Sequence, residues 1–152
     1  MFKRLLTFVL PLFLAVGAGL YFAPIEKAFA KTIPVKNSVQ NSKKLVVYYI
    51  YGKPRCITCK KIEKYTREAV EENFSKEIKA GKVAFQGIDY DKPENKHFLS
   101  DYKLFTKSVI VSKKKNGKEF KYKNLDKIWQ LTNNEKEFKD YIKNEVKSSL
   151  GK

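Results

Sequence analysis

The sequence holds two cysteines, Cys56 and Cys59, whose spacing indicates covalent chemistry. They form a Cys-Ile-Thr-Cys motif that follows a β-branched and aromatic run at 45–51 and a short turn containing Pro54. The residues after the motif have helical periodicity, so the pair lies at the start of a predicted helix. This order predicts a dithiol that closes reversibly to a disulfide.

The start of a helix favours the thiolate form of the first cysteine. Unpaired backbone N–H groups and the positive end of the helix dipole stabilise an anion there, which lowers the pKa of the Cys56 thiol. Cys59, one turn further along, is within reach to resolve a mixed disulfide formed at Cys56. Four flanking cations are expected to lower the same pKa: Lys53, Arg55, Lys60 and Lys61.

Other roles for the cysteine pair remain open. An inert structural disulfide would close a very short loop, which constrains the unfolded chain little. A closed zinc site needs four protein ligands, whereas the sequence has no further cysteine and a single histidine, His97. Two soft thiolates can suffice for Cu(I). Thiol–disulfide exchange is the favoured interpretation, and the alternative is a non-enzymatic thiolate module that binds Cu(I) or a trivalent arsenical.

The charge balance is strongly basic, since 32 Lys and Arg against 16 Asp and Glu give a formal net charge of +16. Such a charge attracts nucleic acid or a lipid surface. However, arginine, whose fork suits phosphate, occurs only as Arg4, Arg55 and Arg67. The lysines are scattered along the chain, so we expect a solvated surface with weak attraction to anionic lipid and no specific nucleic-acid binding.

Residues 1–30 are interpreted as a signal peptide or an uncleaved N-terminal membrane anchor. A basic start precedes the uncharged and mostly apolar run 5–23, and a small-x-small motif at 28–30 offers a cleavage site. The basic start keeps the N-terminus cytoplasmic, so the rest of the chain is expected to be exported to the periplasmic or extracytoplasmic side. An oxidising compartment there suits a disulfide-handling role.

Residues 31–44 are interpreted as a linker and 45–152 as one domain. In the first half of the domain we predict a strand over 45–51, a helix from the cysteines to Gly81, a strand over 82–89 and a helix capped by Asp91. In the second half we predict a strand over 108–112, a hairpin turn at Asn116-Gly117 and an edge strand over 119–123. Helical turns over 125–131 and a last helix capped by Asn134 complete the predicted order. The apolar face of the last helix comprises Phe138, Tyr141, Ile142, Val146 and Leu150. The first strand has no polar alternation, which is typical of a central strand covered on both faces.

This order of elements around Cys-x-x-Cys resembles the thioredoxin fold, an α/β architecture with a central mixed sheet flanked by helices. The resemblance covers roughly residues 45–150. It implies that Cys56 is the nucleophilic cysteine and Cys59 the resolving one, with a protein as redox partner. The predicted supporting residues are Pro54, Arg55, Lys60, Ser108 and Val109.

The sequence departs from thioredoxin at several positions of that pattern. Ile57 and Thr58 replace the Gly-Pro between the cysteines, and Arg55 replaces a tryptophan. The family's buried acid in the first strand falls on Ile50, which cannot accept a proton. Its cis-proline falls on Val109. The preceding peptide bond is expected to be trans, because a non-proline cis bond costs about 3 kcal/mol.

Three longer stretches, at 49–63, 91–98 and 123–129, are similar to small exported thioredoxin-like proteins identified as a nitrophenyl compound nitroreductase subunit family, associated with aromatic arsenical resistance. Nothing in the sequence resembles a flavin or nicotinamide site, so no cofactor is predicted. A nitroreductase role would therefore need a partner that supplies electrons from its own cofactor. Within the last stretch, Leu125, Ile128 and Trp129 are predicted to be core residues.

Overall fold

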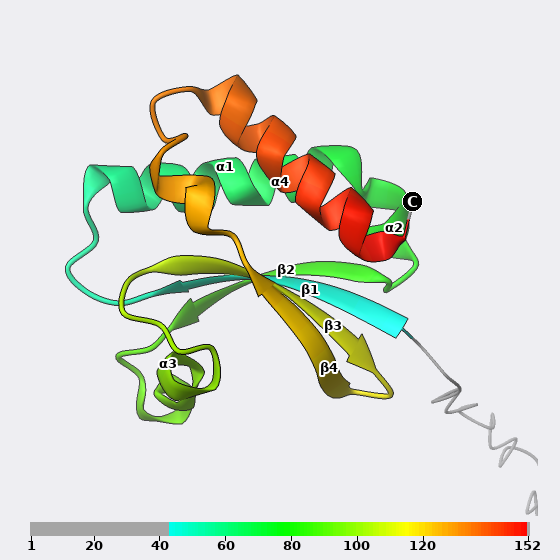
Figure 1. Ribbon diagram of the computed structural model, residues 1–152, viewed down its shortest axis with the longest axis horizontal. Coiled ribbons are helices and arrows are strands. Elements are labelled where there is room, and N and C mark those ends of the chain that lie inside the picture. Colours follow the sequence, from blue (N-terminus) through cyan, green and yellow to red (C-terminus); the bar gives the residue numbers. More distant parts are fainter. Residues whose placement is uncertain (1–42, 152) are drawn as a thin grey trace, which may run out of the picture. The chain divides into compact units, whose positions relative to one another are not determined.

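The computed structural model describes residues 43–151, in which four strands form one mixed sheet (Figure 1). The strands are β1 (Lys43–Tyr51), β2 (Val83–Asp89), β3 (Ser108–Lys115) and β4 (Lys118–Asn124), in the spatial order β2-β1-β3-β4. β2 is parallel to β1, β3 is antiparallel to β1, and β4 is antiparallel to β3. β1 begins at Lys43, earlier than the predicted residue 45.

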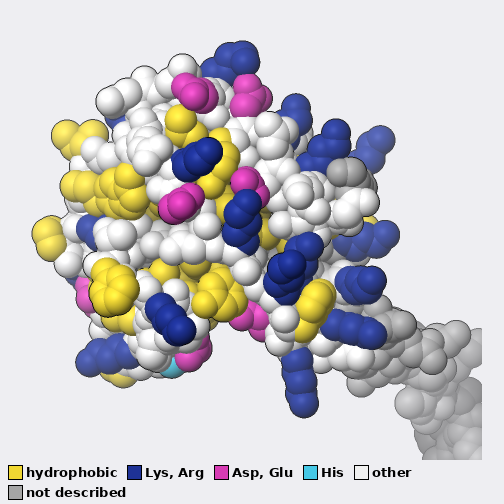
Figure 2. All heavy atoms as spheres, in the orientation of Figure 1, with side chains coloured by type: hydrophobic (Ala, Val, Ile, Leu, Met, Phe, Trp, Pro, Cys, Tyr) yellow, Lys and Arg dark blue, Asp and Glu magenta, His cyan; other side chains and the backbone are white. Residues whose placement is uncertain are grey.

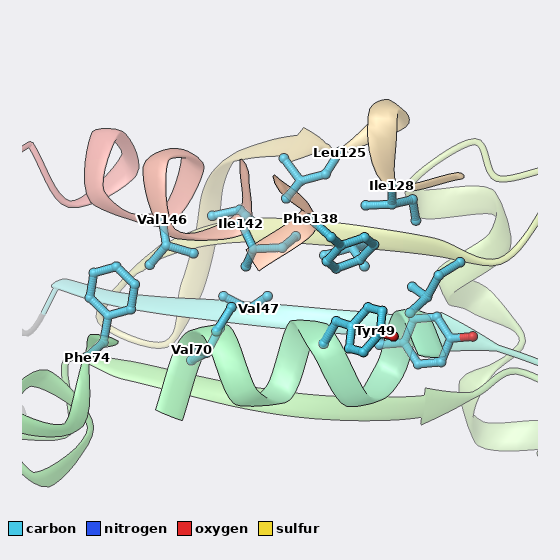
Figure 3. Packing of buried hydrophobic residues seen from close by; sticks show 14 of the residues in the cluster. Val47, Tyr49, Val70, Phe74, Leu125, Ile128, Phe138, Ile142 and Val146 are labelled. Carbon is cyan, nitrogen blue, oxygen red and sulfur yellow. The ribbon is translucent and has the colours of Figure 1, made fainter. Parts of the chain in front are cut away.

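Strand β1 is buried on both faces, as its lack of polar alternation predicts. Residues 45–50 are at most 3% exposed. Because successive side chains point to opposite faces of a strand, the run supplies two cores. One set packs in the larger core with α1 and α4 (Figure 3): Leu45, Val47 and Tyr49. The other set packs in a smaller core beside α3: Val46, Tyr48 and Ile50.

Helices α1 (Ile57–Asn73) and α4 (Glu135–Leu150) cover one face of the sheet, and the short α3 (His97–Asp101) lies on the other (Figure 1). The predicted cap of α4 is confirmed, because the Asn134 side chain accepts the Glu137 N–H at 3.2 Å. Three of the five predicted apolar residues of α4 are fully buried, and the other two pack beside the core. The buried three are Phe138, Ile142 and Val146.

The single long helix predicted from the cysteines to Gly81 is wrong. α1 ends at Asn73, and a separate short helix, α2 (Ser75–Lys79), follows. Phe74 between them has φ −128° and ψ 28°, which is not helical. This break turns the ring of Phe74 into the larger core, where it is 5% exposed. Burial of one aromatic ring therefore outweighs continuation of the helical pattern.

The predicted capping role of Asp91 is also wrong. The segment after β2 forms a 3₁₀ turn, η1 (Pro93–Asn95), whose N-cap residue Lys92 makes no side-chain capping bond. The Asp91 carboxylate accepts the backbone N–H of Lys53 at 2.6 Å instead. This bond ties the loop that precedes the cysteines to the loop after β2.

The predicted hairpin at Asn116-Gly117 is confirmed. Asn116 has φ 53° and Gly117 has φ 78°, the two positive values that a tight I′ turn needs. β4, the edge strand after this turn, is exposed throughout. A 3₁₀ turn, η2 (Asp126–Trp129), then leads into α4.

The order β1-α1-β2-α3-β3-β4-α4, with this strand pairing, is thioredoxin-like, so the predicted α/β fold is confirmed. The predicted signal or anchor over 1–30 and most of the predicted linker lie outside the described residues. Between residues 43 and 151, no helix has the length and apolar character needed to cross a membrane.

Candidate redox site

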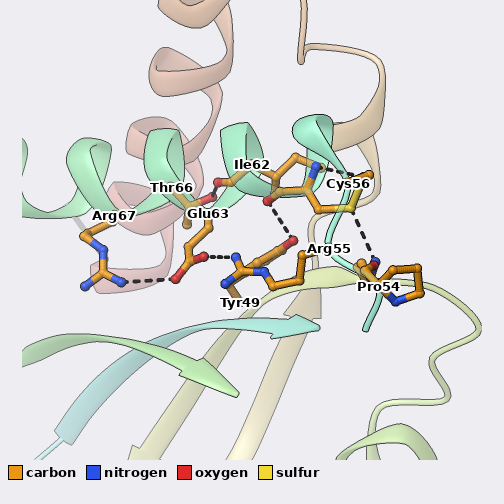
Figure 4. A network of polar contacts seen from close by, with 10 residues as sticks. Tyr49, Pro54, Arg55, Cys56, Ile62, Glu63, Thr66 and Arg67 are labelled. Atoms are coloured by element: carbon orange, nitrogen blue, oxygen red, sulfur yellow. Dashed lines mark hydrogen bonds and ion pairs between the residues drawn. A yellow bond between two sulfur atoms is a disulfide. The ribbon is translucent and has the colours of Figure 1, made fainter. Parts of the chain in front are cut away.

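Cys56 and Cys59 form a disulfide at the tip of α1, just beyond the end of β1 (Figure 4). Cys56 is the N-cap residue, with extended backbone at φ −76° and ψ 166°. Its Sγ accepts the backbone N–H of Cys59 at 3.1 Å. One of the N–H groups that a helix start leaves unpaired therefore points at the first sulfur, the arrangement that stabilises a thiolate.

The two cysteines differ in exposure. Cys56 is exposed, whereas Cys59 is 1% exposed. A thiol on another molecule can approach the sulfur of Cys56 but not that of Cys59. The fold therefore assigns the external exchange to Cys56 and the internal exchange to Cys59.

Tyr49 lies beneath the second cysteine. Its hydroxyl donates to the Cys59 carbonyl oxygen at 2.8 Å, and its side chain is fully buried. Burial raises the pKa of Tyr49 to about 12, so the phenol stays protonated and keeps donating. Ile50, on which the buried acid of thioredoxin falls in the sequence comparison, is one residue along and points into the smaller core on the opposite face. The residue beneath Cys59 is thus Tyr49, which the sequence did not single out.

Lys107, in the loop just before β3, reaches the buried sulfur. Its ammonium nitrogen lies 3.4 Å from Sγ of Cys59 and donates to the Pro54 carbonyl oxygen at 2.5 Å. Among the basic residues of the described chain, Lys107 alone has a recorded hydrogen bond to a cysteine sulfur. The sequence pattern does not single out Lys107; the available signal is its place directly before the third strand.

Arg55 is directed away from the sulfurs, although it is one of the four flanking cations expected to lower the pKa of the Cys56 thiol. Its guanidinium pairs with the Glu63 carboxylate of α1 and lies 4.2 Å from the ring centre of Tyr51 (Figure 4). Glu63 also binds Arg67 at 3.2 Å. Lys60 is exposed and makes no recorded contact with either sulfur. The cation that hydrogen-bonds to a cysteine sulfur is therefore Lys107 rather than any of the four cations named from the sequence.

Ser108 and Val109 begin β3, and in the described chain no hydrogen bond joins either side chain to the cysteines. The bond between them is trans, as expected. The Ser108 hydroxyl donates to the Thr106 carbonyl oxygen at 3.0 Å, and Val109 is buried in the larger core. The sequence resemblance aligned the cis-proline of thioredoxin with Val109, which is a buried strand residue here, whereas Lys107, two residues earlier, reaches the buried sulfur.

Large apolar side chains are exposed around this end of the molecule. Ile57, next to Cys56, is 78% exposed, and Phe105, on the same loop as Lys107, is fully exposed. Trp129 is 37% exposed, and its indole N–H donates to the Lys107 carbonyl oxygen at 3.1 Å. The prediction of Trp129 as core is therefore wrong. η2 turns Leu125 and Ile128 inward and leaves the next residue at the surface.

Several solved structures resemble the chain, including the following two. Trxlp from Edwardsiella tarda EIB202 has 16% sequence identity and a TM-score of 0.38, over 63% of this chain and 85% of that one. Thioredoxin-2, described as a component of malaria parasite protein secretion machinery, has 16% identity and a TM-score of 0.35, over 60% of this chain and 82% of that one. No protein-family model matches the chain. No curated protein matches it either.

Proposed function

We propose that the protein is a thiol–disulfide oxidoreductase that exchanges electrons with a partner protein through Cys56 and Cys59. The observation that carries this proposal is the asymmetry of the pair. An exposed sulfur caps a helix, and a buried sulfur bonded to it lies beside a cation. A structural bridge has no use for an exposed sulfur at a helix tip, because solvent access and a stabilised thiolate make a disulfide labile.

The exchange consists of two successive displacements, each by a thiolate of the partner. A partner thiolate attacks Sγ of Cys56, the Cys56–Cys59 bond breaks, and Cys59 leaves as a thiolate beside the Lys107 ammonium group. A second thiolate of the partner then attacks the mixed disulfide and releases Cys56 as a thiolate. The partner dithiol is oxidised to a disulfide, and two electrons pass to this protein. The reverse sequence reduces a partner disulfide.

A more specific role is that of an electron-carrying subunit in an exported nitroaryl reductase system. This proposal rests on the sequence resemblance of the stretches at 49–63, 91–98 and 123–129 to a nitrophenyl compound nitroreductase subunit family, a resemblance that no protein-family model supports. In this role, a flavin or nicotinamide bound by a partner supplies the electrons, and Cys56 and Cys59 relay them as a dithiol.

A trapping experiment tests the exchange. The full-length Cys59→Ser variant should accumulate a mixed disulfide between Cys56 and its partner, because the resolving thiol is gone. The matched Cys56→Ser variant keeps one thiol, but that thiol is buried, so it should trap nothing. Non-reducing gels and mass spectrometry of the adducts give the readout.

Equal trapping by both variants would contradict the assignment of roles. No trapping by Cys59→Ser, together with one Cu(I) or one trivalent arsenical taken up per reduced chain and lost in each variant, would replace exchange with the thiolate-binding alternative.

A further inference from the structure

The end of the sheet opposite the disulfide carries a cluster of lysines. A hollow of about 330 Å³ lies between the start of β1 and the C-terminal end of α4, and none of the residues of 43–151 that line it carries a carboxylate. Six lysines do, and we call them the lysine face: Lys43, Lys44, Lys82, Lys113, Lys114 and Lys121. Figure 2 shows basic side chains gathered on the right of the view, the side where β1 begins in Figure 1.

Strand pairing places lysines opposite one another at this end of the sheet, where Lys115 and Lys118 lie beside the lysine face and Glu119 lies opposite Lys114. Four lysine pairs lie directly across neighbouring strands: Lys43 and Lys115, Lys44 and Lys114, Lys113 and Lys121, and Lys115 and Lys118. Like charges in such cross-strand positions destabilise a sheet. No ion pair joins any member of the lysine face to a carboxylate of residues 43–151, and an anionic partner would relieve this repulsion.

Some lysines elsewhere in the described chain form ion pairs. Lys139 pairs with carboxylates of both α1 and α4, Lys136 pairs with Asp140, and Lys123 pairs with Glu145. Other exposed lysines of residues 43–151 are without an ion pair, so the lysine face is distinguished by six such lysines lining one hollow.

Apolar side chains share the hollow with these lysines. Leu45 and Leu150 contribute to its wall, and Phe120 on the edge strand β4 is 59% exposed. A site for a small soluble anion needs donors and charge alone, whereas an exposed aromatic ring among lysines suits the boundary between headgroups and acyl chains. The composition of the lysine face thus fits a lipid surface.

The covalent order of the chain points to the same occupant. Residues 1–42 join the domain at Lys43, which belongs to the lysine face, and they contain the uncharged apolar run 5–23. We propose that the lysine face docks on the anionic phospholipid surface of a membrane, with Phe120 at the interface. The disulfide, at the other end of β1, then remains open to a partner. This docking is independent of the redox chemistry.

Amine footprinting of the full-length, oxidised protein tests the proposal. The protein is mixed with vesicles of neutral phosphatidylcholine, or with vesicles that also contain phosphatidylglycerol, and is acetylated with a membrane-impermeant reagent. On the anionic vesicles, acetylation of the lysine face should slow by about fivefold or more, the preference expected per lysine at such a surface. The protection should disappear near 1 M salt, where charges are screened within about 3 Å.

Charge-matched variants separate this face from net charge. The triple variant Lys44→Gln, Lys82→Gln and Lys121→Gln should abolish the protection of the remaining lysines of the face. The control variant Lys92→Gln, Lys96→Gln and Lys103→Gln removes the same charge from exposed positions near α3 and should leave the protection unchanged.

Three results would overturn the proposal. Equal acetylation on both kinds of vesicle would show that no docking occurs. Equal protection of Lys92, Lys96 and Lys103 in the wild type would reduce the effect to general charge attraction. Protection by a soluble polyanion such as heparin, without protection by anionic vesicles, would assign the face to a different partner.

Discussion

The ammonium nitrogen of Lys107 lies 3.4 Å from Sγ of the buried Cys59, across a sequence separation of 48 residues. On reduction, a thiolate formed at Cys59 would lie beside this nitrogen, and the positive charge would stabilise it. The strand residue beneath Cys59 is Tyr49, whose hydroxyl donates to the Cys59 carbonyl oxygen, whereas Ile50 points into the smaller core on the other face. Lys107 therefore brings a cation to Cys59 from a loop rather than from the strand beneath it.

The Lys107→Met variant should make the protein more reducing. Loss of the ammonium group raises the pKa of the Cys59 thiol and destabilises the reduced state, so the reduction potential falls. We expect a shift on the order of tenfold in the equilibrium with glutathione, or about 30 mV. Quantification of both redox states over a series of glutathione ratios measures it.

Lys107→Arg is the matched control, because it keeps the positive charge and should keep most of the wild-type potential. A structural role for Lys107 would lower the stability of the oxidised protein in both variants and leave the potential in place. An unchanged potential in Lys107→Met would show that Lys107 does not act on the sulfur.

Emission from Trp129 should report the redox state. Trp129 is the one tryptophan of the sequence, and its indole N–H donates to the backbone of Lys107, whose side chain contacts Cys59. We expect emission to rise on reduction, because a disulfide quenches indole fluorescence. The midpoint should agree with that from thiol quantification, and emission that stays constant while both thiols appear would contradict this coupling.

Tyr49→Phe should destabilise the oxidised protein at neutral pH. The Cys59 carbonyl oxygen loses its buried donor, at a cost of about 1–2 kcal/mol in the free energy of unfolding. Urea denaturation of the wild type and the variant measures this difference.

The stability advantage of the wild type over Tyr49→Phe should shrink above pH 10 and be lost by about pH 12. The pKa of Tyr49 is raised from 10.0 to about 12 in the folded protein, which favours the neutral phenol. The corresponding stability is complete below pH 10 and is lost as the pH rises through 12, by an amount on the order of 2–3 kcal/mol. The variant lacks this loss, so a stability difference that stays constant from pH 8 to pH 12 would contradict the assignment.

Phe105→Ser should slow exchange with a protein partner while leaving stability and reaction with glutathione unchanged. Phe105 is fully exposed, so its removal costs less than about 0.5 kcal/mol of folding free energy. Its place on the loop of Lys107 suits contact with a docked protein. Phe120→Ser, at the opposite end of the sheet, is the control and should exchange at the wild-type rate. Equal slowing in both variants would argue against a docking role for Phe105.

The sequence alone determined the features that depend on local physics. Two positive φ values suit Asn116 and Gly117, so the hairpin turn was predictable. The Asn134 cap and the apolar face of α4 followed from helical periodicity, and the position of Cys56 at a helix tip followed from the strand-turn-helix order. Each of these features involves residues only a few positions apart.

Tertiary structure decided which side chains surround the sulfurs. Tyr49 rather than Ile50 lies under Cys59 because the faces of β1 are assigned by packing, and a shift of one residue exchanges them. Lys107 is one basic residue among 32 in the sequence, and only the pairing of β3 with β1 brings its loop to the disulfide. The periodic apolar pattern predicts that the helix continues past Phe74, but α1 ends at Asn73 and the Phe74 ring packs in the larger core. Contacts between residues distant in the chain depend on the whole fold, which local propensity does not encode.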